Sequence, residues 1–575
     1  MRIIEIIKSH KVAVILAILV GLVSVAPQLY VLKDHNYRGI QMFGTDAEYF
    51  YVGEVNGALY EDYSKGLFPT DPGKNYYLAP KLGQRIMAFF AKIFNARAIE
   101  INVALKFVGP GLLFLILYGW LLEMFSLKTV ALLAPLFVIL GLNLLAPANL
   151  LDLSSLRTNI DTFLPYTRPI SPLISSVFLF LSLWGIYRLV SSKSTLKAAI
   201  WLGILSGLSL YSYIYTWTFV VVTLGLYFLY FLTKKNWGKV KYLAHTLFIN
   251  GIVVLPFFIN LFRARLDVDY AYTATRVGLI YTHAPIFGIW IVVGFLAIIF
   301  LWPKAYPSTK YFFLILFGSL IVALNQQIIT GVRIQPSHYH WFTTKPLVAI
   351  IVSFLGLYYM GKIISNKKLR MVTLVSIGSI LFLNSIVIQA NSYSSNYPAY
   401  QENQKYVPLF SFLDSTYPQV KNIWASPDLD LAYPELSYLV LAYTRHNAPM
   451  VLDNYSNSQE HTQDMFFLSY RLKGVSSTNI ANVLNQDRNY IASALSGVYY
   501  RDLPGNHQLP DAELHKLALG YDTFYRTPLN QVFKNMNIDL VIEDKKNNDL
   551  HLEKIPFLYV VYENNGLFVY QFKSK

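Results

Sequence analysis

The chain contains no cysteine, and this absence removes three kinds of chemistry. Without thiols there are no disulfide bonds, no zinc–thiolate sites and no thiol nucleophile. Charged side chains are also scarce, at 14% of the 575 residues, against about a quarter in a typical soluble protein. Hydrophobic residues make up 54% of the chain, and the mean hydropathy is +0.39. Much of the surface must therefore face something other than water.

Hydrophobic runs long enough to cross a bilayer, which takes about 20 residues, recur through the first two-thirds of the chain. We expect about eleven spans, at 12–32, 102–122, 129–147, 171–190, 197–213, 215–232, 243–262, 285–302, 311–328, 345–361 and 371–389. The first lacks a small-residue cleavage motif, which favours an uncleaved helix over a signal peptide. The stretch that separates 197–213 from 215–232 fits either a tight turn or a broken helix, and the count depends on which it is.

Acidic residues are fewer than basic ones, and the formal net charge is +15. If the N-terminus is cytoplasmic, the short loops on that side carry enough lysine and arginine to account for the whole excess. Such loops orient membrane proteins, so we expect a multi-pass protein of the cell membrane with an extracytoplasmic C-terminal domain. The scattered basic residues form no single patch, which argues against a nucleic-acid partner.

Polar and ionisable residues gather in the outer segments, and this suggests a site at the membrane interface. The first outer segment, 33–101, is long and aromatic, and it contains Asp46 and Glu48. The outer segments further along the chain supply candidate substrate-binding residues: Arg157, Arg168, Arg333, His338, Tyr339 and His340.

The acidic stretch of the first outer segment predicts a helix that starts near Asp46, with Thr45 as its N-cap. Asp46, Phe50 and Gly53 would share one face of this helix, while Glu48 would point elsewhere. A second amphipathic helix is expected at 82–94, lying flat on the membrane surface.

This layout of an N-terminal span, an acidic first outer loop, interfacial helices, many further spans and an outer domain resembles the GT-C superfamily of polyprenyl-phosphate-dependent glycosyltransferases. Protein O-mannosyltransferases, oligosaccharyltransferases and aminoarabinose transferases share it. The stretch from Asp46 to Glu48 matches the family's acidic motif in position and type. The adjacent carboxylates of the O-mannosyltransferases are not present, which leaves both acids as candidates. The segment 325–339 looks like a late outer-loop pattern of bacterial members.

The resemblance implies transfer of a sugar, with inversion, from a polyprenyl-phosphate donor to a glycan, lipid or protein acceptor at the outer face of the membrane. One carboxylate, Asp46 by preference over Glu48, would take the acceptor's proton. Arg168 and Arg333 would stabilise the departing phosphate. His338 and His340 would assist, or would coordinate a divalent cation with a carboxylate. Nothing in the sequence requires a cofactor, and the metal ligands stay unknown.

The chain divides into a membrane module, 1–390, and an extracytoplasmic α/β domain, 391–575, where apolar stretches shorten. Strands are expected near 421–426, 448–453 and 538–543, and a hairpin is expected to join 557–561 to 567–572 across Asn564-Asn565-Gly566. We expect a mostly α protein whose small α/β domain serves as a lid or an acceptor-binding element. The alternative function is a polytopic transporter or a flippase for lipid-linked sugars, although no internal repeat of the transporter kind is visible.

Overall fold

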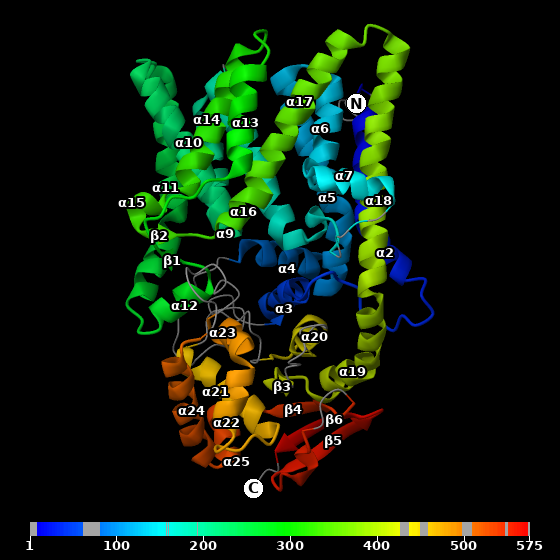
Figure 1. The fold of residues 1–575 in the computed structure, drawn as a ribbon, viewed down its shortest axis with the longest axis vertical. Coiled ribbons are helices and arrows are strands. Elements are labelled where there is room, and N and C mark those ends of the chain that lie inside the picture. Colours follow the sequence, from blue (N-terminus) through cyan, green and yellow to red (C-terminus); the bar gives the residue numbers. More distant parts are fainter. Residues whose placement is uncertain are drawn as a thin grey trace.

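A long helical bundle forms one end of the molecule, and a smaller domain with a β-sheet forms the other (Figure 1). The N-terminal helix starts at the end of the bundle that lies away from this domain. The computed structural model describes residues 9–60, 81–156, 158, 160, 162–191, 194–425, 436–448, 458–496, 509–546 and 550–572.

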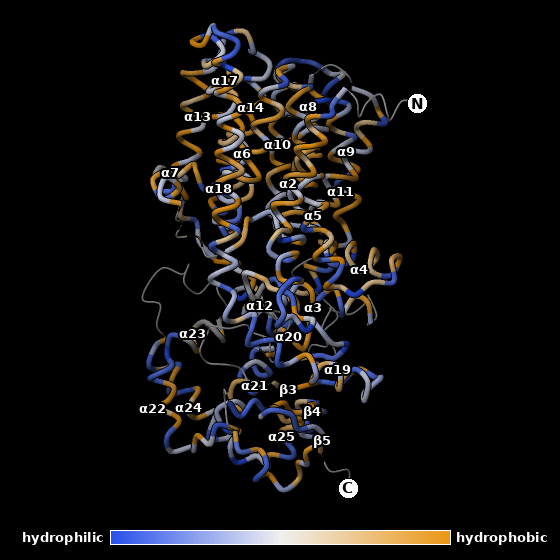
Figure 2. Tube along the Cα trace, turned by 90° about the vertical axis from the view of Figure 1, so that its right-hand side faces the viewer, coloured by the Kyte–Doolittle hydropathy of each residue, from blue (hydrophilic) through white to orange (hydrophobic). Residues whose placement is uncertain are grey.

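Each predicted span coincides with one helix of the bundle. Eight helices in the described ranges are long and apolar enough to cross a membrane, and three apolar helices are shorter. The long ones contain α2 (Lys11–Val31), α5 (Ala98–Phe125), α8 (Ser175–Ser191) together with the π-helical turn η3 (Pro169–Ile174) before it, α10 (Ile214–Thr233), α11 (Trp237–Arg265), α14 (Pro307–Leu324), α17 (Lys345–Ile363) and α18 (Lys367–Asn403). The shorter ones are α6 (Lys128–Leu140), α9 (Leu196–Ser212) and α13 (Ile289–Leu301). Figure 2 shows that hydrophobic residues dominate this half of the molecule. The helical membrane bundle is confirmed, and eleven crossings stay a prediction.

The stretch between α9 and α10 is a tight turn rather than a kink. The Thr246 hydroxyl donates to the Ala199 carbonyl at 3.1 Å, and the Asn250 amide donates to the Ser206 hydroxyl at 2.9 Å. The earlier residue of α9 contacts the earlier residue of α11, and the later residue contacts the later one. The two helices are therefore parallel. Helix α10 connects the end of α9 to the start of α11, so it must run antiparallel to both. The single extended residue Tyr213 therefore forms the turn between α9 and α10.

The C-terminal domain is built on a four-stranded sheet of order β3 (Ile423–Ala425), β4 (Leu540–Asp544), β6 (Leu567–Phe572), β5 (Leu558–Asn564). Strands β3 and β4 are parallel, and the other pairs are antiparallel. Asn565 and Gly566 both have positive φ, which a two-residue hairpin turn requires. The predicted α/β character and the hairpin are confirmed. Of the strand expected at 448–453, all but the first residue lies outside the described part of the chain.

Helices α21 (Gln459–Leu472), α22 (Ile480–Gln486), α24 (Asp511–Arg526) and α25 (Leu529–Asn535) cover one side of this domain (Figure 1). They enclose a core of their own together with Trp424 and Tyr570 from the sheet. Helix α18 leaves the bundle and continues without a break toward the sheet domain, where α19 (Val407–Thr416) follows it. Residue 390 lies inside α18, and the division of the chain at that position stays a prediction.

A second core joins the first outer segment to the C-terminal domain. Helix α3 (Asp46–Tyr60), which begins where it was predicted, packs against α20 (Leu436–Tyr443). A Cβ atom on Gly53 would lie 2.6 Å from the Cβ of Leu441, so glycine permits this close approach. The Asn56 side-chain amide donates to the carbonyls of Leu441 and Ala442, each at 2.9 Å. The helix with the acidic residues is thus held between the bundle and the outer domain.

Helix α4 (Leu82–Phe94) presents an apolar face away from the protein. Phe89 is 59% exposed, Ile93 57% and Phe94 66%, whereas Met87 and Ala88 are buried against the fold. In Figure 2 the helix projects beside the boundary between the hydrophobic bundle and the more polar half. This distribution fits the predicted amphipathic helix on the membrane surface.

Candidate functional site

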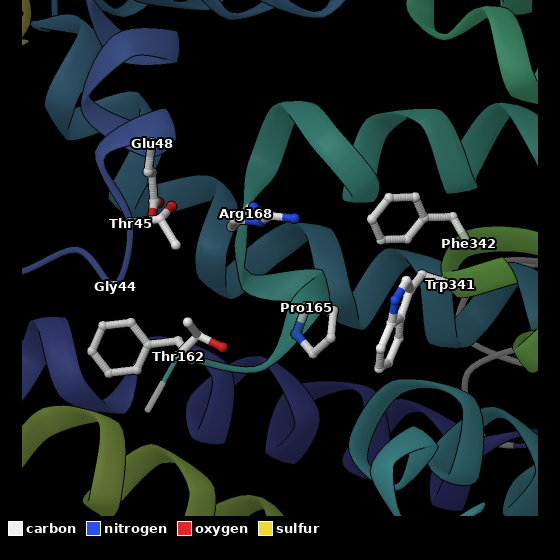
Figure 3. A pocket seen from close by; sticks show the side chains of 9 residues that line it. Gly44, Thr45, Glu48, Thr162, Pro165, Arg168, Trp341 and Phe342 are labelled. Carbon is white, nitrogen blue, oxygen red and sulfur yellow. The ribbon is translucent and has the colours of Figure 1, made fainter. Parts of the chain in front are cut away.

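A cavity of about 280 Å³ opens at the end of the bundle that faces the C-terminal domain. Three segments that are far apart in sequence form its wall: the turn that opens α3, the segment before α8, and the π-helical turn η4 (His340–Thr344) before α17. The lining residues are Gly44, Thr45, Glu48, Thr162, Phe163, Pro165, Arg168, Trp341 and Phe342. Figure 3 shows Thr45 and Glu48 on one side, Trp341 and Phe342 on the other, and Arg168 between them.

The acidic turn supplies one wall of the cavity. The Glu48 amide donates to the Thr45 carbonyl at 3.1 Å, which forms the first turn of α3. Asp46 is the first residue of this helix, between two residues that line the cavity. Its side chain lies outside the described part of the structure.

Glu48 is 2% exposed and belongs to an ion pair within the wall. Its Oε1 accepts a hydrogen bond from the Asn102 amide at 3.1 Å and pairs with the Lys106 ammonium. Lys106 is fully buried in α5, and its Nζ also donates to the Thr167 carbonyl at 3.1 Å. A buried carboxylate is tolerated when it is paired and hydrogen-bonded in this way. Because Glu48 is held by these contacts, Asp46 is the better candidate for the base.

Arg168 is the cationic group that faces the cavity. It follows the 3-10 turn η2 (Pro165–Thr167), and its half-buried guanidinium points across the cavity between Glu48 and Phe342 (Figure 3). The positive charge of Arg168 repels the positive charge of Lys106 and opposes protonation of the His338 ring. No carboxylate whose side chain the structure describes forms a salt bridge with Arg168. This leaves a planar array of donors for an anion that enters the cavity.

The opposite wall is aromatic. Trp341 and Phe342 project from η4 into the cavity (Figure 3). Lys345, the first residue of α17, is 9% exposed and places its Nζ 3.2 Å from the centre of the Trp341 ring. An ammonium over an indole face is a favourable cation–π contact. A second cation therefore lies directly behind the aromatic wall.

The predicted residues of the late outer segment support this wall rather than line the cavity. The His338 ring stacks on Tyr215, with centroids 4.5 Å apart, and hydrogen-bonds to the Tyr213 hydroxyl. The Tyr339 hydroxyl lies 2.5 Å from the Thr218 hydroxyl. These contacts anchor the start of η4 to α10. The His340 ring lies 5.8 Å from the Trp341 ring.

The remaining predicted residues lie elsewhere. Arg333 sits in β2 (Val332–Arg333), where it pairs with Ile280 of β1 (Ile280–Tyr281), and it is not among the residues that line the cavity. Arg157 falls outside the described residues. Among the side chains that the structure places, no group of three His, Asp or Glu residues could hold a metal ion.

Sequence reasoning missed Lys106, Lys345, Trp341 and Phe342. A signal for Lys106 was present, because a lysine within an apolar span is a candidate functional residue by itself. The position of Lys345 at the start of a span carries the same signal. The aromatic pair had no such signal, because aromatic residues near membrane interfaces are common.

Comparisons with known proteins give likeness in structure only. No family model matches the chain, and neither does any curated protein. Among solved structures, the chain is similar to the apo oligosaccharyltransferase of Archaeoglobus fulgidus, with a TM-score of 0.49 and 13% identity over 98% of this chain and 74% of that one. It is also similar to the same organism's AglB in complex with an inhibitory peptide and a dolichol-phosphate, with a TM-score of 0.46 and 13% identity over 99% and 75% of the two chains.

A third similar structure is ArnT from Cupriavidus metallidurans bound to undecaprenyl phosphate, with a TM-score of 0.44 and 12% identity over 98% of each chain. TM-scores below 0.5 at this identity do not establish a shared activity.

Proposed function

We propose that the protein is a membrane glycosyltransferase that moves a sugar from a polyprenyl-phosphate donor to an acceptor at the outer face of the membrane. The observation that carries this proposal is the cavity itself. It places Arg168 between the turn that opens α3 and the aromatic wall. Helix α3 lies at the level where the apolar bundle gives way to the polar domain.

The parts of a polyprenyl-phosphate sugar fit the position of the cavity at the end of the apolar bundle. A polyprenyl chain stays in the bilayer, so its phosphate and sugar lie at the membrane interface, where the cavity opens. The Arg168 guanidinium would bind the phosphate through charge-assisted hydrogen bonds and stabilise the negative charge that grows on it as the bond to the sugar breaks. Trp341 and Phe342 would provide apolar surface for a sugar ring or for the first isoprene units.

Asp46 is proposed as the general base. It lies in the helical turn between the cavity-lining residues Thr45 and Glu48, and Lys106 neutralises the neighbouring Glu48. A single carboxylate on the side opposite the leaving phosphate can take the proton of an acceptor hydroxyl or amide as it attacks the sugar. Attack on the face opposite the leaving group gives inversion.

A transporter or flippase is the alternative, and the positions of the charges argue against it. A transport pathway would place polar groups near the bilayer midplane, at a repeat interface. Here Arg168 lines the same cavity as the acidic turn, and α3, which that turn opens, lies at one end of the bundle next to the outer domain (Figure 1). The proposed orientation, with the N-terminus cytoplasmic and the cavity outside, rests on the basic short loops.

The experiment is a transfer assay with purified protein in nanodiscs and a panel of polyprenyl-phosphate sugars with dolichol or undecaprenyl chains. We expect the wild type to consume at least one donor and to release the polyprenyl phosphate. Asp46→Asn should slow this step by about 10²- to 10⁴-fold, the usual contribution of a general base.

The matched control is Asp34→Asn, which removes a carboxylate from the same outer segment at a position that does not line the cavity. It should keep wild-type turnover. A wild type that consumes no donor of the panel would contradict the activity. A fully active Asp46→Asn variant would contradict only the assignment of the base.

A further inference from the structure

The buried Lys106 ammonium in the cavity wall is surrounded by oxygen atoms of the kinds that also bind metal ions. The Lys106 ammonium contacts a carboxylate oxygen of Glu48 and the main-chain carbonyl of Thr167, and it lies 4.9 Å from the centre of the Phe43 ring. The Asn102 side-chain nitrogen donates to the same carboxylate oxygen. Carboxylate and carbonyl oxygens are among the groups that hard divalent cations prefer in proteins. The lysine ammonium lies between one oxygen of each kind.

The position of Lys106 also joins two walls of the cavity. Glu48 belongs to the turn that opens α3, and Thr167 directly precedes Arg168. An ammonium with three donors can satisfy groups from both segments at once. Its positive charge neutralises Glu48, so the carboxylate does not compete with an incoming anion for Arg168.

We propose that Lys106 is a built-in substitute for a divalent cation, so that binding of a lipid phosphate and sugar transfer at this cavity need no metal ion. This proposal rests on the proposed function for its transfer step, but not for its binding step. It has a second consequence. Shortening Lys106 should open a cation site between the Glu48 carboxylate and the Thr167 carbonyl, whereas an apolar side chain of lysine's length should keep that space filled.

The experiment compares the wild type, Lys106→Ala and Lys106→Met in nanodiscs, each treated with EDTA and then measured with and without Mn²⁺. Undecaprenyl phosphate serves as the binding probe, and thermal unfolding is measured in parallel. The wild type should bind the lipid equally well in EDTA and in Mn²⁺, and Mn²⁺ should leave its Tm unchanged. Both variants should melt below the wild type, because the buried Glu48 loses its counter-charge.

Mn²⁺ should raise the Tm of Lys106→Ala and restore its lipid binding, and it should do neither for Lys106→Met. Loss of lipid binding by the wild type in EDTA, with recovery in Mn²⁺, would overturn the proposal, and this arm needs no variant to fold. An unchanged Tm of Lys106→Ala in Mn²⁺ would overturn the predicted cation site. If the wild type transfers no sugar, the proposed function fails, while the binding and melting measurements still decide the role of Lys106.

Discussion

Replacement of Arg168 by alanine should weaken binding of a polyprenyl phosphate while leaving the fold intact. The guanidinium points into the cavity, and no described carboxylate forms a salt bridge with it. Its removal therefore leaves no described carboxylate without a counter-charge. Thermal unfolding should therefore change little. The loss should appear in the affinity for the anion.

The magnitude follows from the kind of contact. Hydrogen bonds to a charged group contribute about 1.5–3 kcal/mol each, which corresponds to roughly 10- to 150-fold in Kd. Arg168→Lys keeps the charge but loses the planar pair of donors, so its affinity should fall between those of the wild type and the alanine variant. The assay is the Kd for undecaprenyl phosphate in nanodiscs, with a dephosphorylated polyprenol as the reference lipid.

Arg333→Ala is the matched control. Arg333 is also an outer arginine that the sequence predicts as a phosphate ligand, but it lies in β2 and does not line the cavity. Its substitution should change the affinity by no more than about twofold, the effect of a change of roughly 0.5 kcal/mol away from a site. Equal affinities of Arg168→Ala and the wild type, or a greater loss in Arg333→Ala, would refute the assignment of the phosphate site.

Three further predictions concern topology, packing and pH. Because the chain has no cysteine, an impermeant maleimide applied to intact cells should label Thr478→Cys in the outer domain but not Ser308→Cys at the start of α14, next to a short basic loop, and the reverse pattern would invert the orientation. Gly53→Ala should destabilise the protein by about 1–3 kcal/mol, because its Cβ would lie 2.6 Å from a side chain of α20, whereas Gly225→Ala, with nothing within 4 Å, should not. Burial and, to a lesser extent, the nearby acidic Glu460 raise the pKa of Asp464 from 3.8 to about 6. The folded state therefore holds a proton that the unfolded chain releases, so the free energy of unfolding should fall by about 1 kcal/mol between about pH 4 and 6, and unfolding of Asp464→Asn should lack this fall.

Much of the fold could be predicted because its signals are local. Each apolar run predicts one helix of the bundle, since about 20 apolar residues are what a bilayer requires. The hairpin of β5 and β6 was predictable from Asn565 and Gly566, which tolerate the positive φ of its turn. The start of α3 near Asp46 was predicted from Thr45 as its N-cap. The helix begins there, but the capping contact is wrong, because the buried Thr45 hydroxyl forms no hydrogen bond with the described residues and the turn is closed by the Thr45 carbonyl instead.

The candidate site was only partly predictable because its contacts are not local. The pair of Glu48 and Lys106 spans 58 positions of the chain, and no periodic pattern encodes it. In the late outer segment, polarity favoured His338 and Arg333 as ligands, whereas the packing of His338 on Tyr215 turns the aromatic residues Trp341 and Phe342 toward the cavity. The continuation of α18 beyond the apolar run was also hidden, because its last turns are polar and rich in tyrosine.

The central claim is that this cavity binds the phosphate of a lipid-linked sugar. The most direct test is a cryo-EM structure of the protein in nanodiscs saturated with undecaprenyl phosphate. We expect phosphate density within hydrogen-bonding distance of the Arg168 guanidinium, between the turn of Thr45 and the Trp341 ring. An empty cavity at saturating lipid, with the phosphate bound elsewhere on the protein, would contradict it.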